Sequence, residues 1–107
     1  MSEPALQLTR CIAADHPAFA GHFPGRPLLP GALLLAEVME ALRTSPPLSA
    51  RIGERPTIAH AKFLAPIGPG DELGITVHDE AHGLRFEVRR GGVLAASGRL
   101  LPELAVQ

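Results

Sequence analysis

The chain has 107 residues, of which 46% are hydrophobic and 20% are charged, and its formal net charge is -1. This balance is typical of a globular domain, and it offers no basic excess for binding nucleic acid. The longest apolar run, residues 32–36, is far shorter than the roughly 18 residues of a membrane-spanning helix. We therefore expect a single cytoplasmic domain over residues 1–107, with neither nucleic acid nor a membrane as its partner.

The residue types that usually hold metals or run redox chemistry are sparse. Cys11 is the only cysteine, so no internal disulfide can form and no cysteine pair can bind zinc. His78 and His82 stand four residues apart, but a zinc-protease helix requires glutamate at the position that Asp79 occupies. The sequence therefore predicts no metal site and no other cofactor.

The first half of the chain predicts a strand, a loop and a helix. Residues 6–12 alternate in part between apolar and polar, as a strand does. Residues 15–30 contain four prolines and two glycines, which favours an ordered, irregular loop. A helix is expected to begin at Pro30 or Gly31, where proline costs no hydrogen bond, and to end before Pro46. Because most of its surface is apolar, most of its circumference should be covered.

The second half of the chain predicts antiparallel strands. Residues 73–78 and 84–89 alternate strictly between apolar and polar side chains, which is typical of strands with one buried face. Gly91 and Gly92 suit the tight turn of a hairpin whose second strand is residues 93–101. Residues 57–64 are a further candidate strand. The simplest arrangement is an α+β domain in which an antiparallel sheet wraps around one long central helix.

Two segments of the chain resemble a known family. The segment GHFPGRPLLPGALLL, residues 21–35, resembles the active-site segment of the 3-hydroxyacyl-(acyl carrier protein) dehydratases of the hotdog fold. Some forty residues later, KFLAPIGPGDEL, residues 62–73, resembles that family's K-F-x-x-P-x-x-P-G-D-x-L pattern. The resemblance implies a single hotdog domain that removes water from a 3-hydroxyacyl thioester in fatty acid or polyene synthesis.

The resemblance also implies roles for particular residues. His22 matches the catalytic histidine, and a group that titrates near neutrality suits removal of the acidic C2 proton. The N–H of Gly31, at the start of the helix, is expected to stabilise the negative charge that grows on the thioester oxygen. Phe23 and Pro30 are expected, with Gly31, to contact the substrate.

The proton donor is where this chain departs from the family. The resembled dehydratases carry a carboxylate five residues after the glycine of the P-G pair, and Ala36 stands there. Glu37 is next to it but is turned by about 100° around a helix, whereas Glu40 lies on nearly the same face one turn further on. Three alternatives stay open: Glu40 acts through a water, a local change of register brings in Glu37, or the acid is absent.

The two glutamates also have a simpler interpretation. Glu37, Glu40 and Arg43 follow one another at three-residue steps, as in a solvated, charged stripe. If both are solvated, the chain is a weak enzyme or a module that binds acyl thioesters or pairs with an active homologue. Another possible function is that of a hotdog thioesterase, in which Glu37 or Glu40 would direct water at the thioester.

The resemblance implies two partners. In this family the histidine of one protomer faces the helix of the other, so a homodimer or a larger ring of dimers is expected. The acyl chain would run in an apolar tunnel between subunits. The candidates either to line this tunnel or to fill the core are Leu33, Leu34, Leu35, Val38 and Met39, and the core is the expected place for most of them. An acyl carrier protein is acidic, and Arg26, Arg51 or Arg55 would be candidates for its landing patch.

Overall fold

The computed structural model describes residues 3–15, 29 and 31–103, which form five strands and two helices. Apart from its ends, the loop expected over residues 15–30 lies outside the described residues. In chain order the elements are β1 (Leu6–Cys11), α1 (Gly31–Arg43), α2 (Pro46–Ile52), β2 (Thr57–Phe63), β3 (Glu72–Glu80), β4 (Gly83–Arg90) and β5 (Val93–Leu101).

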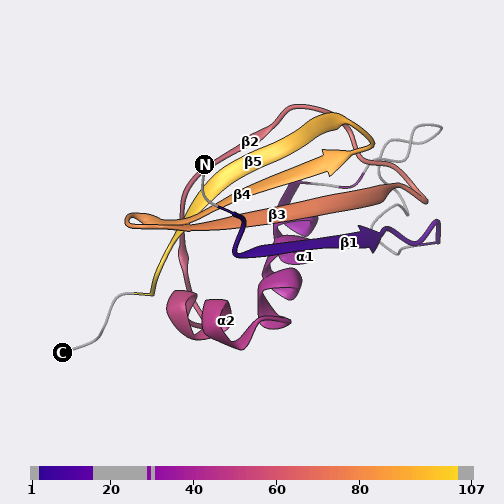
Figure 1. The fold of residues 1–107 in the computed structure, drawn as a ribbon. Coiled ribbons are helices and arrows are strands. Elements are labelled where there is room, and N and C mark those ends of the chain that lie inside the picture. The colour runs from indigo at the N-terminus through magenta and orange to yellow at the C-terminus, as the bar shows by residue number, and fades with distance from the viewer. Residues whose placement is uncertain (1–2, 16–28, 30, 104–107) are drawn as a thin grey trace.

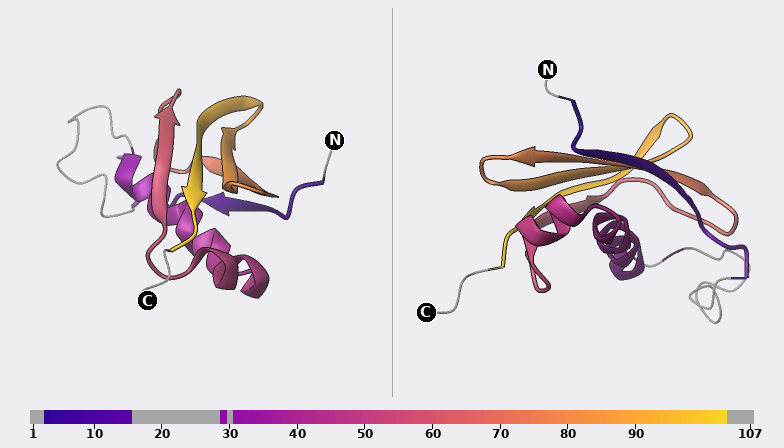
Figure 2. Two further views of the ribbon diagram at one scale, coloured as in Figure 1. Left: turned by 90° about the vertical axis from the view of Figure 1, so that its left-hand side faces the viewer. Right: turned by 60° about the horizontal axis from the view of Figure 1, so that its bottom comes forward.

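The five strands form one antiparallel sheet in the order β1-β3-β4-β5-β2 (Figure 1). β1 and β2 are therefore the two edges of the sheet. Both helices lie against the same side of the sheet, so the fold has one layer of strands and one layer of helices (Figure 2). The α+β class and the antiparallel sheet are confirmed, and the arrangement is consistent with the expected hotdog fold.

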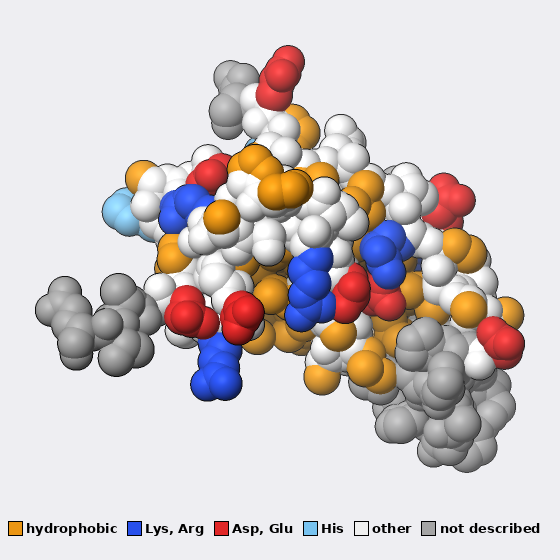
Figure 3. Space-filling view, turned by 90° about the horizontal axis from the view of Figure 1, so that it is seen from below, with side chains coloured by type: hydrophobic (Ala, Val, Ile, Leu, Met, Phe, Trp, Pro, Cys, Tyr) orange, Lys and Arg blue, Asp and Glu red, His pale blue; other side chains and the backbone are white. Residues whose placement is uncertain are grey.

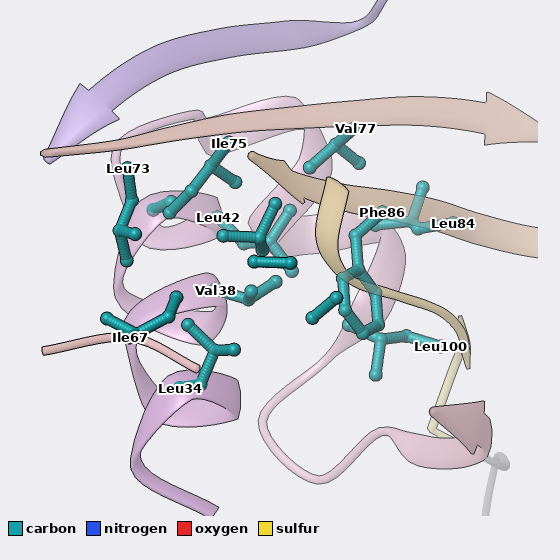
Figure 4. Close-up of a cluster of buried hydrophobic side chains, with 14 of the residues drawn as sticks. Leu34, Val38, Leu42, Ile67, Leu73, Ile75, Val77, Leu84, Phe86 and Leu100 are labelled. Carbon is teal, nitrogen blue, oxygen red and sulfur yellow. The ribbon is translucent and has the colours of Figure 1, made fainter. Parts of the chain in front are cut away.

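The core lies between α1 and the inner face of the sheet (Figure 4). The alternation in β3 and β4 buries the predicted apolar positions, and Phe86 at the centre is only 1% exposed. Burying a side chain of this size contributes on the order of 2–3 kcal/mol. The buried residues that α1 contributes are Leu34, Val38, Ala41 and Leu42.

The expectation of one long helix needs correction, because the helical layer consists of two short helices. α1 ends at Arg43, where the Thr44 hydroxyl and amide donate to the Ala41 carbonyl at 2.6 and 3.1 Å. Pro46 then opens α2 instead of only breaking α1, since proline suits the first turn of a helix. The turn between the helices lets α2 bury Leu48 and Ile52.

Within the part of the chain that the structure describes, only one side of α1 is covered, whereas most of its circumference was expected to be. The side toward the sheet is buried, but Ala32, Leu33, Ala36 and Glu40 on the opposite side are exposed. Leu33 is 37% exposed. An apolar helix face that its own sheet does not cover is suited to contact with another molecule.

The outer face of the sheet is held by charged pairs around Glu80. The Glu80 carboxylate accepts hydrogen bonds from Arg99 at 2.6 Å and from Arg85 at 3.2 Å. Arg99, followed by Arg85, lowers the pKa of Glu80 below its usual value of 4.5. Since the folded pKa lies below the unfolded one, this contribution to stability is present above the unfolded pKa and is lost as pH falls through the folded pKa.

We therefore expect Glu80→Gln to lower the melting temperature at neutral pH. The deficit should begin to shrink as the pH falls below 4.5, the usual pKa of this carboxyl. It should disappear below the lowered pKa of the folded state, where the wild-type glutamate is neutral as well. Thermal unfolding followed by circular dichroism over this pH range measures the effect. A deficit that stays the same at acidic pH would show that packing, and not charge, is what Glu80 contributes.

Among the described residues, no helix is long and apolar enough to cross a membrane. The cytoplasmic location stays a prediction, as does the extent of the single domain over residues 1–107.

Candidate functional site at the start of α1

The chain enters α1 beside the proline- and glycine-rich loop that follows β2. Leu29 is 9% exposed, and its amide donates to the Ile67 carbonyl at 2.7 Å. This bond joins the middle of the first resembling segment to the middle of the second. The first amides of a helix have no partner within the helix, so the Gly31 end of α1 carries partial positive charge. The two segments therefore meet at an end of a helix that favours negative charge.

The ring of Phe63 lies against Gly31. A Cβ built on Gly31 would stand 2.9 Å from Cζ of Phe63, and 3.0 and 3.1 Å from the two neighbouring ring carbons. The N–H of Gly31 is expected to face the thioester oxygen, and the structure places an aromatic side chain of the same chain beside this residue. The ring of Phe63 therefore lies beside the residue whose N–H is the expected donor.

Several of the predicted site residues cannot be placed. His22, Phe23 and Pro30 lie outside the described residues, so their roles as base and substrate contacts stay predictions. Among the residues that the structure does describe, no group of three or more metal-ligating side chains comes together.

The position of the family's acid, Ala36, and the two candidate acids, Glu37 and Glu40, do not all lie on the same side of α1. Ala36 and Glu40 are exposed on the side of α1 away from the sheet, as expected from their spacing. Glu37 instead faces β1, where its carboxylate accepts a hydrogen bond from Nε of Arg10 at 2.7 Å. Its side chain is only 19% exposed. Glu40 therefore shares a face with the position of the missing acid, and Glu37 does not.

The charged-stripe interpretation fits only part of this arrangement. Glu40 pairs with Arg43 on the exposed side, as a stripe would. Glu37 is tied to the sheet edge by Arg10, which sequence reasoning did not single out. Leu6 and Leu8 pack on the core from the same side of β1, so Arg10 takes the third inward position of this strand. That alternation was the available signal, but nothing in it identified Glu37 as the partner.

A groove of about 300 Å³ lies between the flank of α1, the loop that joins α2 to β2, and the start of β2. Of the candidates for an acyl tunnel or the core, Leu35 and Met39 line this groove, Leu34 is in the core, and Val38 is buried in the core at the base of the groove. Figure 3 shows the side that carries the helices, with hydrophobic side chains in a hollow between charged groups. The groove is also lined by Arg43, Glu54, Arg55, Pro56, Ile58 and Leu100.

The two glutamates predict different outcomes on substitution. Glu40→Gln should leave stability nearly unchanged, because exposed pairs contribute about 0–1 kcal/mol, but it should lower turnover by roughly 10² or more if Glu40 is the acid. Glu37→Gln should lower stability by about 1 kcal/mol, because it weakens the partly buried pair with Arg10. Thermal unfolding and initial rates of enoyl thioester formation, measured on both variants, separate the two roles. If Glu37→Gln abolishes turnover while the protein stays stable, then Glu37 and not Glu40 is the acid.

The chain matches known dehydratases in both sequence and structure. A family model of the ApeI-like group, described as ApeI dehydratase, matches residues 1–99. A 3-hydroxyacyl-[acyl-carrier-protein] dehydratase FabZ of Pasteurella multocida is 31% identical over 105 residues, which are 92% of this chain and 67% of that protein. FabZ of Gluconacetobacter diazotrophicus is 39% identical over 75 residues, 64% of this chain and 47% of that protein. This chain thus spans about half to two thirds of the length of these relatives.

A solved structure shares both the fold and a significant part of the sequence. The dehydratase heterocomplex ApeI:P from Xenorhabdus doucetiae contains a chain that is 27% identical, with a TM-score of 0.71. The match covers 89% of this chain and 85% of that one. Since the family match extends over nearly all of β1 to β5 and includes both resembling segments, this chain belongs to the ApeI-like dehydratase family.

Proposed function

We propose that this protein removes water from a 3-hydroxyacyl thioester to give a 2-enoyl thioester. The observation that carries the proposal is the family match over residues 1–99, which includes His22 and the glycine at the start of α1. In the reaction, His22 takes the proton from C2, and the electron pair of that C–H bond forms the C2–C3 double bond. The hydroxyl leaves C3 with a proton from an acid, so one water is released and the thioester is otherwise unchanged.

The start of α1 supplies the stabilisation that this chemistry requires. Loss of the C2 proton puts negative charge on the thioester oxygen, and the Gly31 N–H and the helix dipole favour charge at this place. Removing a single donor of this kind typically costs about 10²–10³ in rate. The Phe63 ring beside Gly31 excludes water from one side of the donor.

The acid is assigned to Glu40, acting through a water. Glu40 lies nine residues after Gly31, which is about 13 Å along the helix, so its carboxylate does not reach C3 directly. It shares the exposed face of Ala36, and its pairing with Arg43 is solvent-exposed and weak. Glu37 is the poorer candidate, because Arg10 holds it toward the sheet.

The direct test is turnover of 3-hydroxyacyl thioesters on an acyl carrier protein. Formation of the conjugated enoyl thioester should be followed by its absorbance, and the reverse hydration should be measured because the equilibrium can hide a forward rate. Release of free carrier thiol without an enoyl product would instead indicate a thioesterase. Absence of any reaction in either direction, with short and long acyl chains, would leave an acyl-binding or partner-dependent subunit.

A second copy of this chain is the proposed partner for β2 and the open side of α1. β2 is an edge strand exposed along almost its whole length, and Ile58, Phe63 and Leu64 are each about half exposed. An unpaired edge with apolar side chains is a template for another chain. Sedimentation at low micromolar concentration should therefore give a dimer or a multiple of it, and a stable monomer would contradict this assignment.

The proposed landing site for the carrier protein is Arg55. Arg51 is held by the Asp79 carboxylate and the Glu80 carbonyl, each at 2.9 Å, so it is engaged within the fold. Arg55 is exposed at the rim of the groove beside α1. A cation there suits an acidic partner, and Arg55→Glu should raise KM for carrier-bound substrate while leaving KM for a pantetheine thioester unchanged. Equal changes in both would argue against docking at this position.

A further inference from the structure

The contact between Phe63 and Gly31 has a defined geometry. The position of a Cβ on Gly31 is nearly equidistant, at 2.9 to 3.1 Å, from Cζ and the two Cε atoms of Phe63. A contact with the ring edge would put Cζ much closer than both of the others. The ring face near Cζ therefore lies over the Cα of Gly31, at a distance that leaves no room for a methyl group.

The backbone of Phe63 is held firmly although its ring is half exposed. Phe63 pairs with Ala96 at the end of β2, and the amides of Leu64 and Ala65 donate to the Ala95 carbonyl at 2.8 and 3.2 Å. The residue is nevertheless 51% exposed. One face of the ring thus covers Gly31, and a large part of the remaining ring is open to another molecule.

Neither Phe63 nor Gly31 lines the groove itself, but the flank of α1 that bears Gly31 continues into it. Gly31, Leu35 and Met39 follow one another at four-residue steps along one flank of α1. Leu35 and Met39 line the groove together with Ile58, which lies near the other end of β2 from Phe63. A thioester held at the Gly31 N–H would therefore place the first carbons of its acyl chain against Phe63 and later carbons in the groove.

We propose that Phe63 is a specificity-determining residue, whose ring binds the first carbons of the acyl chain and directs the chain into this groove. The inference rests on the proposed function, since it takes the thioester to bind at Gly31. A four-carbon chain would rely on the ring alone for apolar contact. A ten-carbon chain would gain further contact from the groove.

The test compares kcat/KM for 3-hydroxybutyryl and 3-hydroxydecanoyl thioesters of an acyl carrier protein. Phe63→Ala should lower the value for the four-carbon substrate by roughly 10- to 100-fold and that for the ten-carbon substrate by less. The ratio of kcat/KM for the ten-carbon substrate to that for the four-carbon substrate should rise by at least about fivefold. A loss of folded protein alone would lower both values equally and leave this ratio unchanged. Phe63→Leu should restore part of the ratio. Val93→Ala is the matched control, because Val93 is equally exposed, at 51%, but lies beside the β4–β5 turn.

A double-variant cycle tests the contact independently of catalysis. Gly31→Ala should lower the melting temperature in the wild-type chain, because its methyl group collides with the ring, and should have little effect in the Phe63→Ala background. Equal effects in both backgrounds would overturn the contact on which the inference depends. Wild-type turnover with an unchanged substrate ratio in Phe63→Ala would overturn the inference alone. A wild-type protein that neither turns over nor binds either thioester would overturn the proposed function and this inference with it.

Discussion

His22→Ala is expected to reduce the rate of enoyl thioester formation by roughly 10²–10⁴, the usual contribution of a positioned general base. The physical reason is that the C2 proton must pass to a group that accepts it at neutral pH, and imidazole is the side chain best suited to do so. The loss should be in kcat more than in KM, since the proton moves only in the transition state. Initial rates at saturating and limiting substrate separate the two parameters.

His82→Ala provides the control for this substitution. His82 is exposed in the turn between β3 and β4, so its replacement should leave turnover unchanged. Circular dichroism of His22→Ala should match the wild type, which would show that the lost rate is chemical. Residual turnover within about tenfold of the wild type would exclude His22 as the base.

Gly98→Ala is expected to give a large loss of stability for the addition of a single methyl group. A Cβ at this position would lie 2.5 Å from the His60 carbonyl oxygen and 2.6 Å from Cζ of Phe86. The first of these belongs to the backbone of β2, so the methyl group must push β2 away from β5. Overpacking of a core typically costs about 1–3 kcal/mol, and we expect the upper end of that range.

The loss should extend to function, because β2 carries Phe63 and forms the proposed dimer edge. Thermal unfolding measures the stability, and turnover below the melting temperature measures the effect on the site. Gly92→Ala is the control, since a Cβ there would meet nothing within 4 Å. If Gly98→Ala melts like Gly92→Ala, then β2 does not approach β5 as closely as the structure indicates.

The sheet was largely predictable from local sequence. The period-two alternation of β3 and β4 placed their buried positions correctly, because a strand with one buried face exposes every second side chain to water. β5 was predicted with its observed bounds from the glycine turn that precedes it. The start of α1 followed from the proline and glycine before it. The second helix was missed because Pro46 was taken only as a stop signal.

The site was predictable only as a motif. Two short segments were enough to identify the family. Their comparison with the family pattern also showed that Ala36 replaces the usual carboxylate. The partners of the remaining residues were not predictable. Arg10 lies 27 residues before Glu37, so no local period relates the two, and only the packing of β1 beside α1 brings them to 2.7 Å.

The sequence by itself determined the strands, the start of α1 and the family, because these depend on residue types at short, fixed spacings. Only the tertiary structure decided that Glu37 faces Arg10 while Glu40 stays on the open side, and that Phe63 covers Gly31. Residues 31 and 63 are brought together by the pairing of β2 with β5 and the packing of α1 on the sheet. Such contacts join distant parts of the chain, and they form because the apolar faces of separate elements must be buried together.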